Sequence, residues 1–476
     1  MCSDQSPFAE LPDVRTVATI GTSKRREATD ITLVTQLSFE RLHMLEGQCR
    51  AWTGVIAAAV HVPVVGGKAV VSRGGGGKGG GGGGPAEPQR VPLEDVLARL
   101  RAFHAEAEAS APCKLDVSLS VQTFASVWLA GLYPVNTMRN RALALARTDV
   151  ALLLDVDFWP SAELSELMLV PGKYASLAAA VAAGNAIVLP AFETAAGGAR
   201  GVAVARAAVA EGKPAAVRAR ASGALKAFHV DRYAQGHRAT DYARWAASER
   251  PYRVAYQEGY EPYVLVARAR VPWCDERFVG YRKNKVVHLM HLASAGLQFV
   301  VHPRAFVVHA PHPRAATWKV THKTGLWDAI GDMYADVKRR LAAGTYVPAS
   351  RYACGQHRMG PGGGERPDGA AAEAEAALAA VAERAAERER RERAIAAQEA
   401  NVAQREDQAT KEEQGGGGGG KEEEHKEQGG EGLATASGVA ASGAAASGAA
   451  ASGAAVSGAT VSGATASGAA DGTAAS

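Results

Sequence analysis

Cysteines and long apolar runs are both scarce in this chain. The 476 residues include five cysteines, at positions 2, 49, 113, 274 and 354, with no Cys-x-x-Cys pair. This spacing argues against a cysteine-based zinc site and allows at most two disulfides beside a free thiol. The sequence has no apolar stretch long enough to span a membrane, and its first 30 residues lack the apolar segment of a signal peptide. Neither a transmembrane helix nor a secretory leader is therefore predicted from the sequence as written.

A strong charge of one sign is also absent. Lys and Arg number 53 and Asp and Glu number 49, so the formal net charge is +4. Such a near balance gives no electrostatic reason to expect a nucleic-acid partner.

Composition divides the chain into one globular domain and several non-globular segments. Residues 1–30 are polar and without period, and we predict a leader there. Residues 31–350 are predicted to form the globular domain, with a flexible glycine-rich insertion at 74–84. Residues 351–414 alternate alanine with charge and predict a solvated helical segment. Residues 415–476 are Gly/Ala/Ser repeats, which predict a disordered tail.

The domain opens with a pattern typical of α/β proteins. A β-branched run at 31–35 predicts a strand, Ser38 can cap a helix, and a second apolar run at 55–64 predicts the next strand. Strand, helix, strand is the opening of a nucleotide-binding α/β fold. Thr35 and Gln36, at the tip of the first strand, are candidates for contact with a base or ribose. The alternative is that they only turn the chain.

Two aspartates follow the most apolar strand of the sequence. The run at 150–154 is apolar throughout, as in a strand buried on both faces, and ends at Asp155 and Asp157. The carboxyl end of such a strand is where open α/β sheets bind ligands. Two neighbouring carboxylates suit Mg²⁺ or Mn²⁺ that shares a diphosphate. The alternative is that one of the pair is a capping or turn residue.

Further polar candidates flank this pair along the chain. His309 leaves a predicted strand at 305–308 and can supply a third metal ligand, although most single histidines are structural. Arg139 and Asn140 lie on the polar side of a helix predicted over 135–147. The planar guanidinium of Arg139 suits a diphosphate or an acidic sugar. A solvated helix face is the alternative.

A strand end and an aromatic-rich segment supply candidate contacts with a sugar substrate. Glu193 follows a predicted strand at 186–190 and either holds an acceptor hydroxyl or forms a salt bridge. Residues 242–263 contain Trp245 and Tyr260 among six aromatic residues. Aromatic rings stack on the apolar faces of sugars, and ordinary core packing is the alternative.

Several motifs, taken in order across about 31–330, resemble the LARGE-type glucuronyltransferases. They are YPVNTMRN, LLLDVDFWPS, VLPAFE, DERFVGYRKNK and FVVHAPH. The resemblance implies a GT-A fold, that is, a Rossmann-like mixed sheet with helices on both faces. It also implies Mn²⁺ or Mg²⁺ as cofactor, a UDP-sugar donor, a glycan or glycoprotein acceptor and an inverting transfer, with glucuronic acid as the expected sugar. Family members are Golgi membrane proteins, so a Golgi location is expected. The chain departs from the family pattern at Arg282 and Lys283, and within 192–236.

The resemblance leads to a mechanistic hypothesis. Asp157 and His309 would bind Mn²⁺, and Asp155 would contact the metal or the donor ribose. A carboxylate on the opposite side would deprotonate the acceptor hydroxyl. Asp275 is the first choice for this base, with Glu276 and Glu261 as alternatives.

The remaining site candidates, Asn284 and Lys285, lie shortly after Asp275 and Glu276 in the sequence. Lys285, together with Arg139, is expected to bind the diphosphate and any donor carboxylate, and Asn284 is expected to face the acceptor. Three other functions stay open: a carbohydrate-binding protein that has lost catalysis, a hydrolase of nucleotide sugars, and a transferase that uses another UDP-sugar.

Overall fold

The computed structural model describes residues 14–71, 88–312 and 317–352. Within these residues an eleven-stranded mixed sheet is flanked by helices, and a four-stranded sheet lies beside it. The predicted glycine-rich insertion at 74–84, the predicted helical segment at 351–414 beyond residue 352, and the predicted tail at 415–476 lie outside the described residues.

The large sheet has the order β1-β6-β3-β2-β7-β13-β9-β14-β12, and β4 and β5 extend it from β3. Its strands are β1 (Arg15–Ile20), β2 (Thr32–Ser38), β3 (Val55–Val65), β4 (Lys68–Val71), β5 (Gln89–Val91), β6 (Lys114–Thr123), β7 (Val150–Leu153), β9 (Asn185–Leu189), β12 (Tyr252–Val254), β13 (Tyr263–Ala267) and β14 (Gln298–Val301). Strands β6, β3, β2 and β7 run parallel. The predicted α/β class and the opening strands are confirmed.

Strand β13 runs antiparallel to both of its neighbours, β7 and β9. Val264 pairs with Leu153, so the first residue of β13, Tyr263, lies beside the end of β7. The carboxyl ends of β2 and β7 and the amino end of β13 therefore meet at one edge of the sheet.

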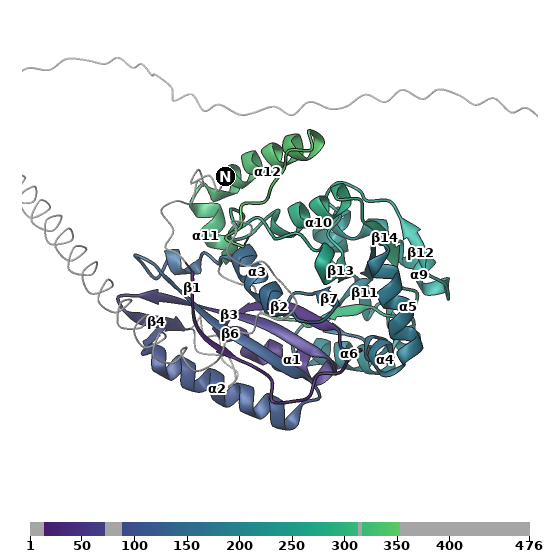
Figure 1. Ribbon diagram of the computed structural model, residues 1–476, viewed down its shortest axis with the longest axis horizontal. Coiled ribbons are helices and arrows are strands. Elements are labelled where there is room, and N and C mark those ends of the chain that lie inside the picture. Colours follow the sequence, from purple (N-terminus) through teal and green to yellow (C-terminus); the bar gives the residue numbers. More distant parts are fainter. Residues whose placement is uncertain (1–13, 72–87, 313–316, 353–476) are drawn as a thin grey trace, which may run out of the picture. The chain divides into compact units, whose positions relative to one another are not determined.

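Helices cover both faces of this sheet, as Figure 1 shows for α2 and α3. Helices α1 (Leu42–Ala51) and α2 (Leu93–Ser110) pack against one face, and α3 (Val135–Leu145) packs against the other. The alternation of β2 explains this arrangement, because Leu33 belongs to the core under α1 and α2 while Val34 belongs to the core under α3.

The remaining helices of eight or more residues are α4 (Ala162–Leu169), α5 (Pro171–Ala182), α6 (Gly198–Glu211), α7 (Lys213–Ala221), α10 (Asn284–Ser294) and α12 (Leu326–Ala342). One helix was expected over 162–183, and the structure has two because Pro171 begins a new helix. Among the described residues, no helix is both long and apolar enough to cross a membrane.

The small sheet has the order β11-β10-β15-β8. Its strands are β8 (Phe158–Pro160), β10 (Ala191–Thr194), β11 (Leu225–Ala227) and β15 (Val307–His309). β8 follows β7 after a short turn, so this sheet continues from the edge at which Asp155 and Asp157 lie.

The predicted leader at 1–30 is wrong for the residues described there. Strand β1 pairs antiparallel with β6, and Val14 and Val17 are buried. Lys24 donates to the carbonyl oxygens of Ala111 and Cys113, so the segment that follows β1 is bound to the residues just before β6. A strand of six residues that covers a sheet edge has too short an alternating pattern to be recognised in the sequence.

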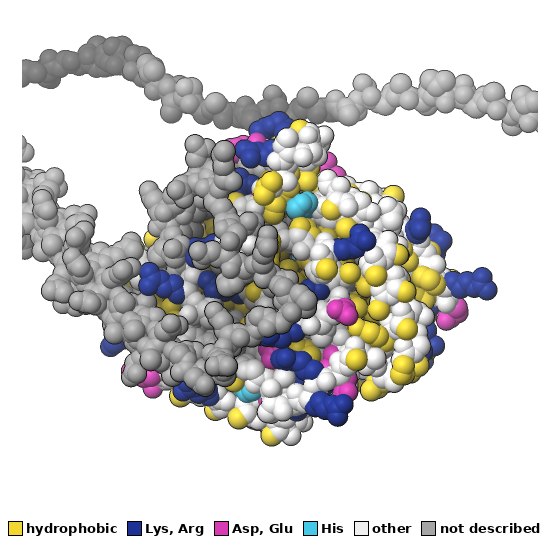
Figure 2. All heavy atoms as spheres, in the orientation of Figure 1, with side chains coloured by type: hydrophobic (Ala, Val, Ile, Leu, Met, Phe, Trp, Pro, Cys, Tyr) yellow, Lys and Arg dark blue, Asp and Glu magenta, His cyan; other side chains and the backbone are white. Residues whose placement is uncertain are grey.

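Cys49 on α1 and Cys113 immediately before β6 form a disulfide within the core. Cys274 is a buried free thiol. On the face that Figure 2 shows, basic and acidic side chains are both distributed among apolar ones, as the balanced composition predicts.

Candidate active site and metal centre

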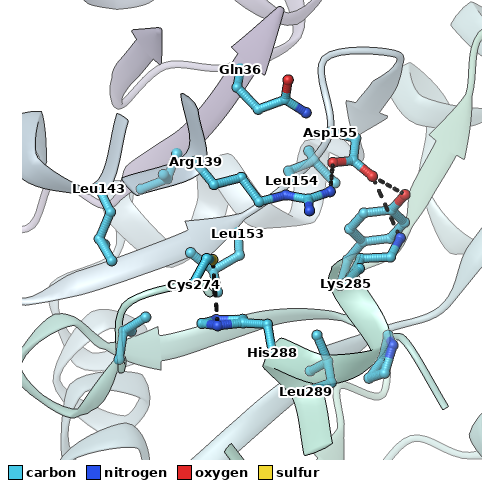
Figure 3. Close-up of a pocket in the computed structure, with 14 residues that line it drawn as sticks. Gln36, Arg139, Leu143, Leu153, Leu154, Asp155, Cys274, Lys285, His288 and Leu289 are labelled. Carbon is cyan, nitrogen blue, oxygen red and sulfur yellow. Dashed lines mark hydrogen bonds and ion pairs between the residues drawn. The ribbon is translucent and has the colours of Figure 1, made fainter. Parts of the chain in front are cut away.

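A pocket lies where β2, β7, β13, α3 and α10 meet. Its polar lining comes from Gln36, Arg139, Asp155, Tyr263 and Lys285, and Figure 3 shows the side chain of Arg139 crossing it toward Asp155. The rest of the lining is mostly apolar, which is typical of a small-molecule site with a few orienting polar groups.

The carboxylate of Asp155 contacts two cations and a hydroxyl group. Arg139 Nη2 donates to Oδ1 at 2.9 Å, the Tyr263 hydroxyl donates to Oδ2 at 3.0 Å, and Lys285 Nζ lies 3.5 Å from Oδ2. Burial alone would raise the pKa of Asp155, but Lys285 and Arg139 outweigh burial and lower it to about 2. Asp155 is therefore a permanent anion that orients two cations.

Arg139 also joins α3 to the start of α10. Its Nη1 donates to Oδ1 of Asn284 at 2.8 Å and to Oδ1 of Asn136 at 3.0 Å. The structure therefore brings together four predicted residues, Arg139, Asp155, Asn284 and Lys285, from three separate segments of the chain.

Asp157 lies in a different cluster, with two histidines. Ligand atoms of Asp157, His309 and His312 all lie within 4.8 Å of one another. His312 Nε2 is 2.9 Å and His309 Nε2 is 3.8 Å from Oδ2 of Asp157. The strand register causes this proximity, because Phe158 of β8 pairs with His309 of β15.

Electrostatics keep Asp157 ionised. Burial would raise its pKa, but hydrogen bonds from His309 and His312 and the charge of Arg41 hold the pKa well below its usual range. Arg41 Nη1 lies 3.3 Å from Oδ2. A carboxylate and two imidazoles at this separation fit a divalent ion such as Mn²⁺.

One of the three predicted metal ligands is corrected. Asp157 and His309 belong to the cluster, whereas Asp155 is not among its ligand atoms. The Asp155 oxygens contact Arg139, Tyr263 and Lys285 instead. Sequence analysis missed His312 as a candidate ligand. The available signal was its position three residues after His309 in the segment that leaves β15.

The first choice for the base, Asp275, is wrong on this geometry. The residue is 2% exposed, and its carboxylate accepts hydrogen bonds from Arg277, at 2.6 Å for Nη2, and from the Tyr346 hydroxyl at 3.0 Å. Glu276 is also engaged, by Asn140 Nδ2 at 2.9 Å and by Ser350.

The third candidate base, Glu261, directly precedes Pro262 and Tyr263, which line the pocket. Burial raises its pKa, partly offset by the charge of Lys285, and Asp155 raises it further. Within the part of the chain that the structure describes, the Glu261 carboxylate accepts no hydrogen bond. Of the three predicted bases, Glu261 is therefore the one whose carboxylate oxygens are free to accept a proton.

Two predicted contacts with the donor fail because of side-chain direction. Thr35 points to the sheet face opposite Gln36 and is buried there. Asn140 is buried and donates to the Cys274 carbonyl oxygen, so its role is structural. Gln36 does line the pocket and accepts a hydrogen bond from the Tyr133 hydroxyl.

The predicted acceptor contacts mostly belong to the core. Trp245 and Tyr260 are fully buried, with polar atoms bonded to the His302 carbonyl oxygen and to Thr240. Their predicted stacking on sugar is therefore wrong, and core packing was the correct alternative. Glu193 lies 3.6 Å from Lys226, as in the salt bridge considered as its alternative.

The fold and the site together are those of a GT-A-type glycosyltransferase. Comparison with known proteins narrows this class. Residues 96–326 match the family described as "Glycosyl-transferase for dystroglycan". Over this region the chain is similar to the LARGE-type glycosyltransferases.

Two relatives illustrate the similarity. The chain is 34% identical over 284 residues to the xylosyl- and glucuronyltransferase LARGE2 of Homo sapiens, which covers 60% of this chain and 33% of the relative. It is 31% identical over 288 residues to the xylosyl- and glucuronyltransferase LARGE1 of Danio rerio, covering 60% of this chain and 31% of the relative. The chain thus spans about one third of the length of the curated relatives it matches.

Proposed function

We propose that this protein is a metal-dependent inverting glycosyltransferase that moves a sugar from a UDP-sugar to a glycan acceptor, with glucuronic acid as the first candidate. One observation carries the proposal: two neighbouring aspartates belong to two different charged clusters. Asp157 lies with His309 and His312, and Asp155, two residues earlier in the chain, forms ion pairs with Arg139 and Lys285. A divalent-ion site and two cations at one sheet edge are what transfer from a nucleoside diphosphate requires.

Asp157, His309 and His312 would hold the ion, which neutralises charge on the departing diphosphate. Arg139 and Lys285 bind the diphosphate oxygens or the carboxylate of an acidic sugar, because both are cations fixed in place by Asp155. Gln36 and the apolar pocket lining receive the nucleoside.

Glu261 is the proposed general base. It takes the proton of the acceptor hydroxyl while that oxygen attacks the anomeric carbon, and the bond to the diphosphate breaks on the opposite side. Its raised pKa makes it a better proton acceptor than an ordinary carboxylate.

We place the domain in the Golgi lumen. The supporting observation is the core disulfide between Cys49 and Cys113, since disulfides form and persist in oxidising compartments. The family resemblance leads to the same proposal.

The direct test is UDP release by the full chain from a panel of UDP-sugars, with glycan acceptors, Mn²⁺ or EDTA. Release should be donor-selective, EDTA-sensitive, acceptor-dependent and lost in Asp157→Ala. His43→Ala, an exposed histidine on α1, serves as the matched control and should keep full activity.

Other outcomes distinguish the remaining functions. Release of free sugar without acceptor would identify a hydrolase. No release from any donor, together with Mn²⁺-dependent UDP binding by calorimetry, would contradict the transferase proposal and favour a binding protein.

A further inference from the structure

The loop before α10 has an unusual backbone. Arg282 has φ 98° and Lys283 has φ 58°, and Gly280 nearby has φ 68°. Residues other than glycine rarely adopt positive φ, and a value of 98° for arginine lies outside even the left-handed helical region. Such a conformation persists only where surrounding contacts impose it.

Helix α12 supplies those contacts. The guanidinium carbon of Arg282 lies 4.2 Å from the centre of the Trp327 ring, and Nη1 donates to the Trp327 carbonyl oxygen. The ammonium of Lys283 lies 4.5 Å from the centre of the Tyr334 ring. Trp327 and Tyr334 are seven residues apart, about two helical turns, so they present one face to the loop.

The same helix packs against the body of α10. Val286 and Val287 of α10 share an apolar cluster with Ile330 and Val337 of α12. Preceding residues of the loop are also fastened, because the Tyr281 N–H donates to Thr321 Oγ1 at 3.1 Å. The loop is therefore held from its first residue to its last.

This loop places two site residues. Asn284 and Lys285 follow it directly as the first residues of α10. Asn284 accepts a hydrogen bond from Arg139, and Lys285 lies 3.5 Å from Asp155 and 3.9 Å from the centre of the Tyr263 ring. A change of φ at Arg282 or Lys283 would move both side chains together.

We infer that Trp327 and Tyr334 are positioning residues for donor binding: they hold the loop at 280–283 in its left-handed conformation and thereby place Lys285 beside Asp155. The inference rests on the proposed function. α12 begins at the last residue of the segment that matches the family, so the match does not assign this role.

The test combines Trp327→Ala with a backbone rescue. Trp327 is only half-buried, so its removal leaves the core largely intact. Without the ring, Arg282 is free to leave positive φ, and we expect the KM for the UDP-sugar to rise about tenfold with a smaller change in kcat. Trp327→Phe keeps a ring for the guanidinium and should stay near wild type.

The rescue distinguishes positioning from a loss of general stability. Glycine adopts positive φ without strain, so Arg282→Gly added to Trp327→Ala should restore KM. Asp328→Ala, the exposed neighbour on the same helix, is the matched control and should leave KM unchanged. A Trp327→Ala variant that matches this control, or a double variant that is not rescued, would overturn the inference.

A second measurement does not depend on activity. Trypsin cleaves after Lys283 only when the loop opens, so Trp327→Ala should raise this cleavage rate about tenfold relative to Asp328→Ala. If the wild-type chain transferred no sugar, the proposed function would fail while the cleavage rates would still test the loop. Equal cleavage in all variants would refute the positioning role.

Discussion

At the level of single residues, the structure gives Asp155 and Asp157 different partners although they lie one residue apart. Asp155 contacts the cations of α3 and α10. Asp157 contacts the imidazoles of His309, the last residue of β15, and of His312, which follows that strand. The pKa of each carboxyl is lowered, but by different groups. We therefore propose that the site separates a cation-orienting carboxylate, Asp155, from a metal-binding one, Asp157.

Replacing His312 tests the composition of the metal cluster. His312→Ala removes one of three ligands, so we expect the Mn²⁺ dissociation constant to rise at least about tenfold and UDP release to fall in parallel. Calorimetric titration of Mn²⁺ measures this directly. His43→Ala should bind as wild type, and an unchanged affinity in His312→Ala would remove His312 from the cluster.

Replacing Glu261 tests the base. Glu261→Gln should lower kcat by roughly 100-fold or more while donor binding is kept, because a neutral amide cannot accept the acceptor's proton. In the wild-type enzyme, activity should rise with pH through the pKa of Glu261, which burial places above that of an ordinary glutamate.

Asp275→Asn should affect stability, in contrast to the effect of Glu261→Gln on kcat. It weakens contacts with Arg277 and Tyr346, so the melting temperature should fall. A variant Asp275→Asn that was fully stable but inactive, beside an active Glu261→Gln, would reverse the assignment.

At the level of secondary-structure elements, the site depends on strand direction. Because β13 is antiparallel to β7, Tyr263 at its start reaches Asp155 at the end of β7. Because β8 pairs with β15, Asp157 and His309 meet. Neither pairing follows from the order of elements in the sequence.

The disulfide provides a prediction at this level, since it ties α1 to the start of β6. Its cysteines are 64 residues apart in sequence. Cys49→Ala together with Cys113→Ala should lower the free energy of unfolding by about 2 to 4 kcal/mol, chiefly by freeing the unfolded chain. Urea denaturation with and without a reducing agent measures this. A reductant that destabilised the double variant as much as the wild type would contradict it.

At the level of the whole molecule, buried neutral histidines make stability depend on pH. Burial lowers the pKa of His61 and His288 to about 3 and that of His302 to about 4. In the unfolded chain these groups titrate near 6.5. Below that pH the unfolded state binds protons that the folded state does not, so acid favours unfolding.

The free energy of unfolding should therefore be level above about pH 7 and decrease below about pH 6.5, by up to about 1.4 kcal/mol per pH unit for each of these histidines. Urea denaturation at pH 7.5, 6.5 and 5.5 tests this. His61→Gln should reduce the slope and the exposed His43→Gln should not. A stability that stays constant down to pH 5.5 would refute the explanation.

Local patterns in the sequence were sufficient for the α/β class, the strand that precedes Asp155, and the helix α3. Apolar periodicity is a short-range property, and it marks buried strands and amphipathic helices wherever they lie in the fold. The same patterns predicted Asp157, His309 and Arg139 as site residues, because strand ends and polar helix faces can be read from neighbouring residues. Lys285 was predicted from the family resemblance.

Only the tertiary structure decided which of these residues share a site. The edge strand β1, the free Glu261, the occupied Asp275 and the buried Trp245 and Tyr260 all depend on partners distant in sequence. A side chain's exposure and partners are set by strand register and by the packing of elements such as α12. These arise from non-local contacts that no local pattern encodes.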